Sequence, residues 1–469
     1  MCTFPQSDHD HFRTLLYRNN ASEILVETTD NGRRLPTVAI PRRTRVAAEI
    51  TATIQSRWNL AACCLFSLPS DAFSEDWPRY QVAEVSPDDS KSPTGMQWFT
   101  TESLNAEPLA ESADLVAIQQ SQAMFDRYRG CTLSGFFGKP GWLRIVTDWV
   151  RDNAAISGLN LTGKFLQFNA SPTFSLIRFE TDGPALWFKA VGRPNLHEYS
   201  ITLKLASAFP NFVPKILAAK PEWNAWLTSE GQGSHPDERS GVRVWIAVAR
   251  QLAQLQIATA GQALHLIDAG CHDVRASSLS DAVDPFLQAI AGFMQQQTKA
   301  SPAPLSRTEL SQLGIHLRKA LSNLVDSGVP NVLGHLDLNP GNILVTKNNC
   351  IFLDWEEACV GQPVLTLQYL LEHLRRLRSM NEHWQRKLIS AYVETWRCFV
   401  QPRVLIESLE VAPCLAAFAH AVAGDLWRKV DPQRDAASAR YLRSLARRMK
   451  READAWPAAQ SQRSVPCQN

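Results

Sequence analysis

The sequence lacks three features that would assign it to a special class of protein. It contains no run of 18 apolar residues, so no membrane-spanning helix is expected. The first residues show no basic segment followed by an apolar one, so no secretion signal is expected. The ten cysteines include no pair at Cys-x-x-Cys spacing, the pattern of many zinc and redox sites. We therefore expect free, buried thiols and a reducing, cytoplasmic setting.

Charge of one sign is also not in excess. Lysine and arginine total 48 and aspartate and glutamate total 46, so the net charge of +2 neither favours nor excludes an anionic partner. Basic residues are concentrated only between positions 440 and 451, where a helix is expected. A basic helix can contact nucleic acid, but a solvated helix is the commoner case. We therefore expect neither a nucleic-acid nor a membrane partner.

What the sequence does contain is a segment that predicts a hairpin. Two short runs rich in β-branched and aromatic residues, Ile343–Val345 and Cys350–Leu353, flank a polar turn centred on Asn348. Asparagine tolerates the left-handed backbone of a tight turn, which favours a hairpin at this point. A hairpin folded about Asn348 would bring Asn342 and Asp354 face to face, roughly 5 Å apart.

Oxygen-bearing side chains gather around this hairpin. An amide and a carboxylate at such a separation can share a hard cation such as Mg²⁺, so Asn342 and Asp354 are candidate metal ligands. Asp337 precedes Asn342 by five residues, with a tight Asn-Pro-Gly loop between them. A carboxylate held near the metal but not on it suits a base that deprotonates a hydroxyl group. The alternative is a solvated Asn-Pro-Gly turn before an ordinary hairpin.

The segment His335-Leu-Asp337-Leu-Asn-Pro-Gly-Asn342-Ile-Leu, followed by Asp354-Trp355-Glu356, resembles the aminoglycoside phosphotransferase and choline-kinase-like branch of the protein-kinase-like family. The resemblance extends over roughly residues 160–430. It implies an α+β, two-lobe protein-kinase-like fold. The small β-rich lobe would cover residues 161–230, and the larger helical lobe would cover residues 231–456.

The same resemblance implies Mg²⁺-dependent transfer of the γ-phosphoryl group of ATP or GTP to a hydroxyl of a small-molecule acceptor. Asp337 would accept the hydroxyl proton, and Asn342 and Asp354 would hold the metal ion. His335 would brace the catalytic loop rather than react. Catalysis of this kind depends on placement and electrostatics, so loss of one metal ligand should be severe.

A lysine and a glutamate upstream complete the predicted nucleotide site. Lys189 lies within an apolar strand and is interpreted as the lysine that holds the α- and β-phosphates, the alternative being a solvated edge-strand lysine. Glu198 is the acid expected to pair with Lys189, although its spacing from Asn195 also fits a helix capping box. The hinge that meets the adenine ring would consist of Ser229, Glu230 and Gly231.

Two positions depart from the family pattern. The segment 167–174, where a glycine-rich phosphate loop is expected, contains no glycine, so side chains such as Asn169, Ser171 and Thr173 would have to replace backbone donors. Thr366 stands where relatives usually carry aspartate, although a threonine can still cap the following helix. These departures favour one alternative, a nucleotide-binding scaffold that no longer catalyses.

Residues 1–128 resemble a Nudix module in the order of their predicted strands and helix. A Nudix helix presents several glutamates to a metal ion for pyrophosphate hydrolysis. In this chain Thr53, Ser56 and Arg57 occupy would-be glutamate positions, and only Glu49 remains nearby. We therefore expect a Nudix-like but inactive α/β module. A Nudix-type hydrolase acting through this module is the second alternative.

The remaining segments are expected to connect the modules and to enclose the acceptor pocket. Residues 129–160 predict a linker rich in glycine and proline, followed by a docking helix with Trp142 and Trp149 on one face. Residues 457–469 are expected to be disordered. The helices after residue 367 are expected to wall the acceptor pocket, and no acidic cluster stands out in them. An aminoglycoside acceptor is therefore not implied.

Overall fold

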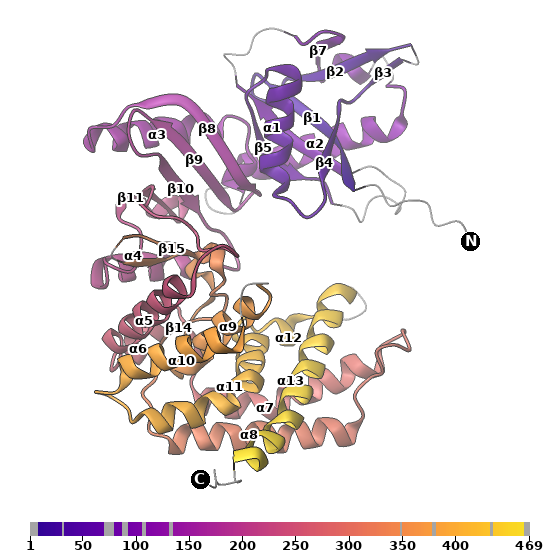
Figure 1. Cartoon of the computed structure of the whole chain (residues 1–469). Helices are drawn as coiled ribbons and strands as arrows, with labels where there is room; N and C mark the ends of the chain where they lie inside the picture. Colours follow the sequence, from indigo (N-terminus) through magenta and orange to yellow (C-terminus); the bar gives the residue numbers. More distant parts are fainter. Residues whose placement is uncertain are drawn as a thin grey trace. The chain divides into compact units, whose positions relative to one another are not determined.

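The computed structural model describes residues 8–30, 32–69, 79–86, 92–105, 109–130, 135–347, 349–377, 381–431 and 435–463. The chain divides into two compact units, and each is described by itself. The first comprises residues 1–199 with 215–230, and the second comprises residues 200–214 with 231–469. Strands dominate the N-terminal region and helices the C-terminal region, which confirms the mixed α+β class (Figure 1).

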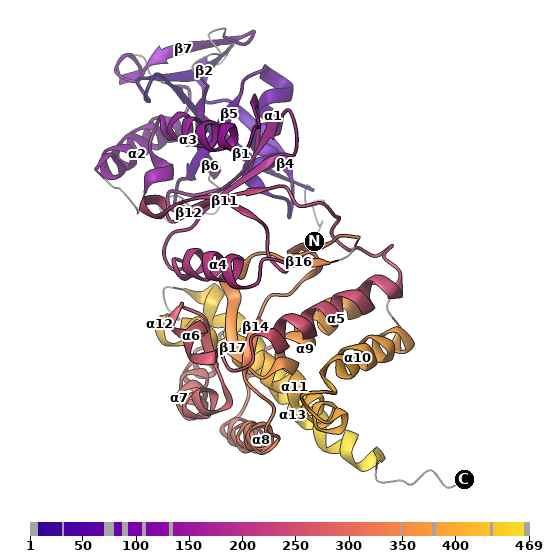
Figure 2. The same cartoon turned by 90° about the vertical axis from the view of Figure 1, so that its left-hand side faces the viewer.

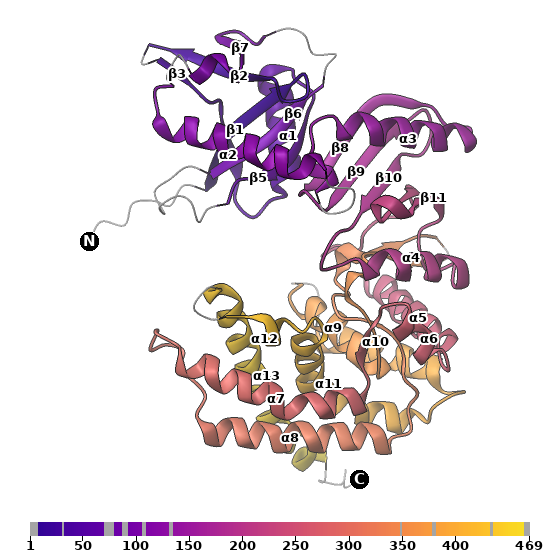
Figure 3. The ribbon, with the colours of Figure 1, turned by 180° about the vertical axis from the view of Figure 1, so that it is seen from behind.

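A seven-stranded sheet forms the N-terminal part of the first unit. Its strands are β1 (His9–Arg18), β2 (Glu23–Thr29), β3 (Gly32–Arg34), β4 (Thr37–Pro41), β5 (Ala62–Ser67), β6 (Arg79–Val85) and β7 (Met96–Thr100). Strands β1 and β6 run parallel, and the other pairs are antiparallel. The strand alternation places Phe12 and Leu16 against α1 (Val46–Trp58), and Leu15 and Tyr17 in the core with α2 (Ser112–Arg129; Figures 1 and 3). The Nudix-like assignment itself stays a prediction.

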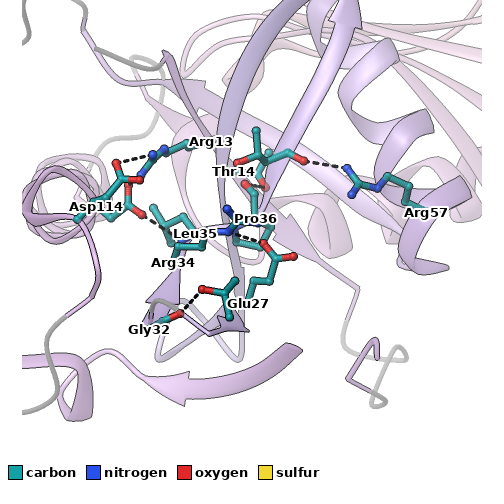
Figure 4. A network of polar contacts seen from close by, with 12 residues as sticks. Arg13, Thr14, Glu27, Gly32, Arg34, Leu35, Pro36, Arg57 and Asp114 are labelled. Atoms are coloured by element: carbon teal, nitrogen blue, oxygen red, sulfur yellow. Dashed lines mark hydrogen bonds and ion pairs between the residues drawn. The ribbon is translucent and has the colours of Figure 1, made fainter. Parts of the chain in front are cut away.

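A buried carboxylate ties α2 to this sheet. Asp114 accepts hydrogen bonds from Arg13 Nη1 at 2.5 Å and from the backbone N–H of Leu35 at 3.0 Å (Figure 4). It also accepts one from the Tyr80 hydroxyl at 2.9 Å, and Arg13 pairs in addition with Glu111. Burying a carboxylate is costly unless it is paired and hydrogen-bonded, so this network fixes α2 against β1 and β6.

A five-stranded antiparallel sheet completes the first unit. Its strands, in spatial order, are β11 (Ile216–Lys220), β12 (Ala225–Ser229), β10 (Leu186–Ala190), β9 (Ser175–Thr181) and β8 (Leu161–Ala170). The helix α3 (Trp142–Ile156) contributes Trp142, which is 1% exposed and lies 5.1 Å from the ring of Phe137. Phe137 in turn contacts Phe188 of β10, and both sheets share one hydrophobic core. Trp142 is therefore a core residue, and the docking role of its helix stays a prediction.

One glutamine side chain joins the two sheets. Gln167 of β8 is 1% exposed and faces the backbone of Cys64 in β5. Its Oε1 accepts a hydrogen bond from the Cys64 N–H at 2.8 Å, and its Nε2 donates to the Cys64 carbonyl at 2.9 Å. The side-chain amide therefore takes the place of a neighbouring strand, and it satisfies two buried backbone groups at once.

Helices build most of the second unit. They are α4 (His197–Ala208), which begins in the first unit, α5 (Val242–Ala258), α6 (Ala263–Asp268), α7 (Ala276–Gln295), α8 (Arg307–Asp326), α9 (Pro363–Arg375), α10 (Glu382–Trp396), α11 (Pro402–Ala423), α12 (Leu426–Lys429) and α13 (Ala436–Arg463). One core lies among α7, α8, α11 and α13 (Figure 3). A second core includes α5 and α10, which pack side by side (Figure 2). By length and composition alone α11 could cross a membrane, but 61% of its apolar window is buried within the structure, as in a core helix.

Short strands lie at both ends of, and within, the segment from His335 to Asp354. β13 (His272–Val274), β17 (Ala358–Gly361) and β14 (Val332–His335) form a three-stranded sheet. β15 (Ile343–Val345) and β16 (Cys350–Phe352) form the predicted hairpin.

The basic residues of α13 have partners within their own unit. Arg443 donates to the carbonyl of Phe293 at 3.1 Å, at the end of α7. Arg447 donates to the carbonyls of Ala303 at 3.0 Å and Pro302 at 3.3 Å, in the segment between α7 and α8. These guanidinium groups fasten α13 to a stretch of chain that lies well over a hundred residues earlier.

Candidate functional site

The catalytic-loop candidate begins where β14 ends. The backbone N–H of Asp337 donates to His335 Nδ1 at 3.1 Å. The carbonyl of Asp337 accepts from the backbone of Asn339 at 2.8 Å and from Asn342 Nδ2 at 2.9 Å. Asn339 Oδ1 in turn accepts from the N–H of Gly341 at 2.8 Å, which fixes the predicted tight turn. The loop therefore holds the backbone of Asp337 in one place through several independent contacts.

The Asp337 carboxylate itself faces outward. Its side chain is 48% exposed, so it is open to a ligand. Oδ2 accepts from Asn339 Nδ2 at 3.1 Å, and Oδ1 lies 3.8 Å from His373 Nε2 on α9. A carboxylate with one oxygen oriented by an amide and the other next to an imidazole can accept a proton from a hydroxyl group that approaches it.

His335 is buried beneath this loop and uses both ring nitrogens. Nδ1 accepts from the Asp337 N–H, so Nε2 carries the proton and donates to the carbonyl of Leu353 at 3.0 Å. Burial lowers the pKa of His335, which keeps the ring neutral. The side chain therefore connects the loop of Asp337 to the residue before Asp354, and this geometry agrees with bracing rather than reaction.

The hairpin differs from the prediction by one residue of register. Ile343 pairs with Phe352, and the N–H of Leu353 donates to the carbonyl of Asn342 at 2.9 Å. Asn342 thus lies opposite Leu353, and not opposite Asp354 as a fold about Asn348 would require. The reason is that Thr346 and Asn349 close the turn by their own hydrogen bonds, which moves its centre toward the N-terminus. Asn348 itself lies outside the described residues.

The two predicted metal ligands still offer suitable oxygens. Because Asn342 donates through Nδ2, its Oδ1 is the atom available to a cation. Asp354 is exposed and takes a left-handed backbone with φ of 62°, which carries the chain out of β16 into the short helix Trp355–Glu357. A carboxylate oxygen of Glu356 lies within 4.8 Å of one of Asp354. Amide and carboxylate oxygens are hard donors of the kind that Mg²⁺ prefers.

A threonine supports the loop where relatives usually have an aspartate. Thr366 Oγ1 accepts from the backbone N–H of His335 at 2.9 Å and is 1% exposed. The expectation that Thr366 caps the following helix was wrong, because α9 begins at Pro363 and its N-cap is Gln362. The hydroxyl instead holds the start of the catalytic loop, and Gly334 leaves room for it, since a Cβ there would lie 2.8 Å from Oγ1.

Two titratable residues next to Asp337 were not singled out from the sequence. Burial, followed by the charges of Glu356, Asp337 and Asp354, raises the pKa of Glu357 to about 7. Burial lowers the pKa of His373, on α9. Neither residue belongs to a recognisable motif. Their positions depend on how α9 and the 3-10 turn at 355–357 pack around the loop. The sequence pattern does not predict this packing.

In the first unit, Lys189 and Glu198 form the predicted ion pair. Lys189 Nζ lies 2.5 Å from Glu198 Oε1, and the two side chains are 14% and 1% exposed. Lys189 is not on an edge strand, because β10 pairs with β9 on one side and β12 on the other. The rings of Phe174 and Trp226 also lie 5.9 and 5.7 Å from Nζ. The solvated edge-strand alternative is therefore wrong.

The predicted hinge residues end this sheet. Ser229 pairs with Leu186, and the N–H of Glu230 donates to the carbonyl of Ala185 at 2.7 Å. Arg178 grips the Glu230 carboxylate at 2.7 and 2.9 Å and thereby lowers its pKa. Gly231 already belongs to the second unit, where a Cβ would lie 3.1 Å from Leu344. A direct role in adenine binding stays a prediction.

The glycine-free turn between β8 and β9 is closed by its own hydrogen bonds. Ser171 Oγ accepts from the backbone N–H groups of Thr173 at 3.3 Å and Phe174 at 2.9 Å. The N–H of Phe137 holds the carbonyl of Pro172 at 3.0 Å from outside. The N–H groups that a phosphate would need are thus already used within the turn.

The helix of the N-terminal module carries no set of acids that would suit a Nudix hydrolase. Thr53 Oγ1 donates to the carbonyl of Glu49 at 2.7 Å, and Ser56 Oγ donates to that of Thr53 at 3.1 Å. Arg57 Nη1 donates to the carbonyl of Thr37 at 3.0 Å. These side chains satisfy local backbone groups, which is a structural use.

Residues 196–403 match the family described as "Phosphotransferase enzyme family". No curated protein matches the chain. Solved structures that resemble it include a macrolide 2′-phosphotransferase from Brachybacterium faecium, with 19% identity, 64% of this chain and 97% of that one covered, and a TM-score of 0.42.

Two kinases also resemble the chain. An ethanolamine kinase from Plasmodium vivax has 12% identity, 71% and 94% coverage and a TM-score of 0.47. A choline kinase from Streptococcus pneumoniae has 13% identity, 65% and 99% coverage and a TM-score of 0.40. The family match over residues 196–403, which contains Glu198 and the whole loop from His335 to Asp354, therefore supports a phosphotransferase-family domain in this segment.

Proposed function

We propose that the protein transfers the γ-phosphoryl group of ATP or GTP to a hydroxyl group of a small molecule. The observation that carries this proposal is the Asp337 loop, an outward-facing carboxylate on a backbone fixed by His335, Asn339 and Asn342. The match of residues 196–403 to the phosphotransferase family supports it. Phosphoryl transfer needs placement and electrostatics more than covalent chemistry from the protein, and a rigid loop of this kind supplies placement.

In this reaction the acceptor oxygen attacks the γ-phosphorus, and the bond to the leaving nucleoside diphosphate breaks. Asp337 accepts the proton of the attacking hydroxyl. Asn342 Oδ1 and the carboxylates of Asp354 and Glu356 would hold Mg²⁺, which when bound neutralises charge on the phosphate oxygens. His335 is a positioning residue, since both its nitrogens are bonded to the backbone on either side of the site.

Lys189 would bind the nucleotide phosphates, and Glu198 keeps the ammonium group oriented and charged. The pair is enclosed, since Glu198 is 1% exposed and Lys189 is 14% exposed. Removing one member of such a pair leaves a buried charge without its counter-ion, which costs more than the loss of a surface pair. Ser229, Glu230 and Gly231 are proposed as the hinge beside the nucleotide base.

Asp337→Asn and Asp354→Asn provide the decisive test. Each variant, with ATP, Mg²⁺ and a pool of hydroxylated acceptors, should lose phosphoryl transfer by about a hundredfold or more, because each removes a charge from the reacting centre. Asp281→Asn, which changes an exposed acid on α7, is the matched control and should keep full activity. Undiminished transfer in both variants would refute the proposal.

The turn closed by Ser171 favours a second candidate, a scaffold that binds nucleotide without catalysis. Such a scaffold would gain thermal stability from Mg²⁺ and ATP while transferring no phosphate to any acceptor. The same assay, combined with a melting curve, separates the two functions.

A further inference from the structure

The side chains around the Asp337 carboxylate indicate what kind of acceptor fits beside it, if the proposed phosphotransfer is correct. A hydroxyl that loses its proton to Asp337 must touch that carboxylate, so the neighbouring side chains must touch the rest of the acceptor. Three helices of the second unit supply them. His373 of α9 lies 3.8 Å from Asp337 Oδ1, and His420 of α11 and Tyr441 of α13 lie within reach of the charge of Asp337.

His420 and Tyr441 form a pair of their own. His420 Nε2 and the Tyr441 hydroxyl are 2.7 Å apart, and the two rings meet edge to face with centroids 6.2 Å apart. Tyr441 is 46% exposed, which leaves part of its ring open. His420 Nδ1 is buried and finds no hydrogen-bond partner among the described residues.

The charges that act on His373 balance, whereas Glu357 acts as a further acid on Tyr441. Those acting on His373 are two acids, Asp337 and Glu372, and two bases, Arg376 and Arg448. Glu372 is only 13% exposed and is paired with Arg448, so its charge is compensated within the structure. Gln368 also donates to Glu372 Oε1 at 3.1 Å.

The histidines add no positive charge at neutral pH, because burial lowers the pKa of both His373 and His420. Asp354 and Glu356, whose charges also act in this region, are the proposed ligands of Mg²⁺. A polycation would need a surplus of acids here, and a quaternary ammonium would gain most from a cage of aromatic faces. Among the described residues, the acids that act on His373 and Tyr441 are Asp337, Glu357 and Glu372, and Arg376 and Arg448 oppose them. Two tyrosine rings lie next to His420, and of these only the ring of Tyr441 is exposed.

Imidazole and phenol groups both donate and accept hydrogen bonds, as hydroxyl groups do. We propose that His373, His420 and Tyr441 form an acceptor subsite for an uncharged polyhydroxyl compound of the carbohydrate class, free or as the ribose of a nucleoside. The exposed Tyr441 ring offers a flat surface for the C–H face of a sugar ring. The imidazoles offer donors and acceptors for the hydroxyls next to the one that reacts.

A panel of acceptors tests this inference on the whole protein. Phosphate transfer from labelled ATP is measured with aldopentoses, aldohexoses and nucleosides, and in parallel with choline, ethanolamine and an aminoglycoside at the same concentration. We expect kcat/KM for the best neutral polyol to exceed that of every amine by at least about tenfold. A preference for an amine overturns the subsite and leaves the phosphotransfer standing. Transfer to none of them overturns the phosphotransfer, and the subsite with it.

Variants of the subsite separate binding from chemistry. Tyr441→Phe keeps the ring and removes the hydroxyl, and His373→Gln keeps hydrogen-bonding capacity but removes the ring. We expect the KM for the polyol to rise about five- to tenfold in Tyr441→Phe, a size typical of one lost hydrogen bond, with a smaller change in kcat. The exposed His383 on α10 supplies the control, since His383→Gln should change neither constant. An unchanged KM in both subsite variants overturns the inference.

Discussion

At the scale of single residues, His335 connects the two backbone segments of the site, at Asp337 and at Leu353. A neutral imidazole is the only protonation state that serves both of its contacts, because Nδ1 must accept from Asp337 and Nε2 must donate to Leu353. If Nδ1 were protonated, its N–H would face the backbone N–H of Asp337, so two donors would oppose each other. Protonation would also place a positive charge in a fully buried position. The brace is therefore sensitive to acid.

This sensitivity gives a prediction for pH. Burial lowers the pKa of His335 in the folded protein below 6.5, the ordinary value that the unfolded chain should have. The unfolded state then binds more protons between these two values, so stability is fully present above pH 6.5 and is lost as the pH falls below it. Urea midpoints measured from pH 8 to pH 5 should fall less steeply on the acid side in His335→Gln than in the wild type.

The pH dependence of the free energy of unfolding should differ between the wild type and His335→Gln by at most one bound proton. His373 and His420 are also held neutral by burial, but they remain in both proteins and cancel in the comparison. Equal slopes for the two proteins would mean that His335 tolerates protonation in the folded state.

Residue identities were predictable from the sequence where a motif fixed them, and not where packing did. The Lys189–Glu198 pair and the contact of Asn342 with the Asp337 loop follow from spacing along one strand, one helix and one turn. The contact of Thr366 with His335 joins positions 31 residues apart, with the hairpin β15–β16 and β17 between them. Such a contact depends on where α9 packs, so the sequence pattern did not indicate that the Thr366 hydroxyl would bind the start of the loop.

At the scale of elements, the turn between β8 and β9 is the main departure from a phosphate-binding loop. The sequence showed that it has no glycine, and the structure adds that Ser171 occupies two of its N–H groups. Gly192, which follows β10, packs against the turn so closely that a Cβ there would lie 2.3 Å from Thr173. The turn is therefore held on the side of Gly192 as well as by Phe137.

If nucleotide phosphates lie at this turn, freeing its N–H groups should strengthen binding. Ser171→Ala removes the hydroxyl that now accepts from Thr173 and Phe174, and the KM for ATP should fall about threefold, the gain from one additional hydrogen bond of modest strength. The measurement is initial velocity against ATP concentration at saturating acceptor. Thr162→Ala, at the far end of β8, is the control and should leave this constant unchanged. A higher KM in Ser171→Ala would instead mean that the Ser171 hydroxyl itself binds phosphate.

The hairpin β15–β16 explains why element boundaries were easier to predict than register. Its two strands were found within a residue or two, since they are the only apolar runs in that stretch. The pairing between them was displaced by one residue, because hydrogen bonds between Thr346 and Asn349 close the turn. Successive side chains of a strand point to opposite faces, so a displacement of one residue changes which side chains share a face.

At the scale of the whole molecule, the N-terminal strands and the sheet of Lys189 share one core. Glycine and proline around residues 129–141 predicted a linker, yet Phe136, Phe137 and Trp142 in or next to it are buried. The glycines permit close packing, since a Cβ at Gly138 would lie 2.7 Å from the ring of Tyr128. Composition alone does not distinguish a flexible linker from a tightly packed crossing.

Gln167 allows this coupling to be measured. Gln167→Ala removes the side-chain partner of the buried Cys64 N–H and leaves the Cys64 carbonyl with only the weak donor Cys63 Sγ, at 3.7 Å. We therefore expect a loss of about 2–3 kcal/mol in the free energy of unfolding of the first unit. Gln55→Ala, on the exposed side of α1, should cost less than about 0.5 kcal/mol. The check is urea unfolding followed by tryptophan fluorescence. A negligible loss in Gln167→Ala would mean that the two sheets do not depend on this contact.

The contacts of α13 have a consequence for how the protein is made. One core of the second unit needs α7, α8 and α13 together, and Arg443 and Arg447 hold carbonyls near the end of α7. On the ribosome, the apolar faces of α7 and α8 therefore stay uncovered by α13 until residues 436–456 have been synthesised and have left the exit tunnel. During that interval the nascent chain is most exposed to aggregation and to chaperone capture.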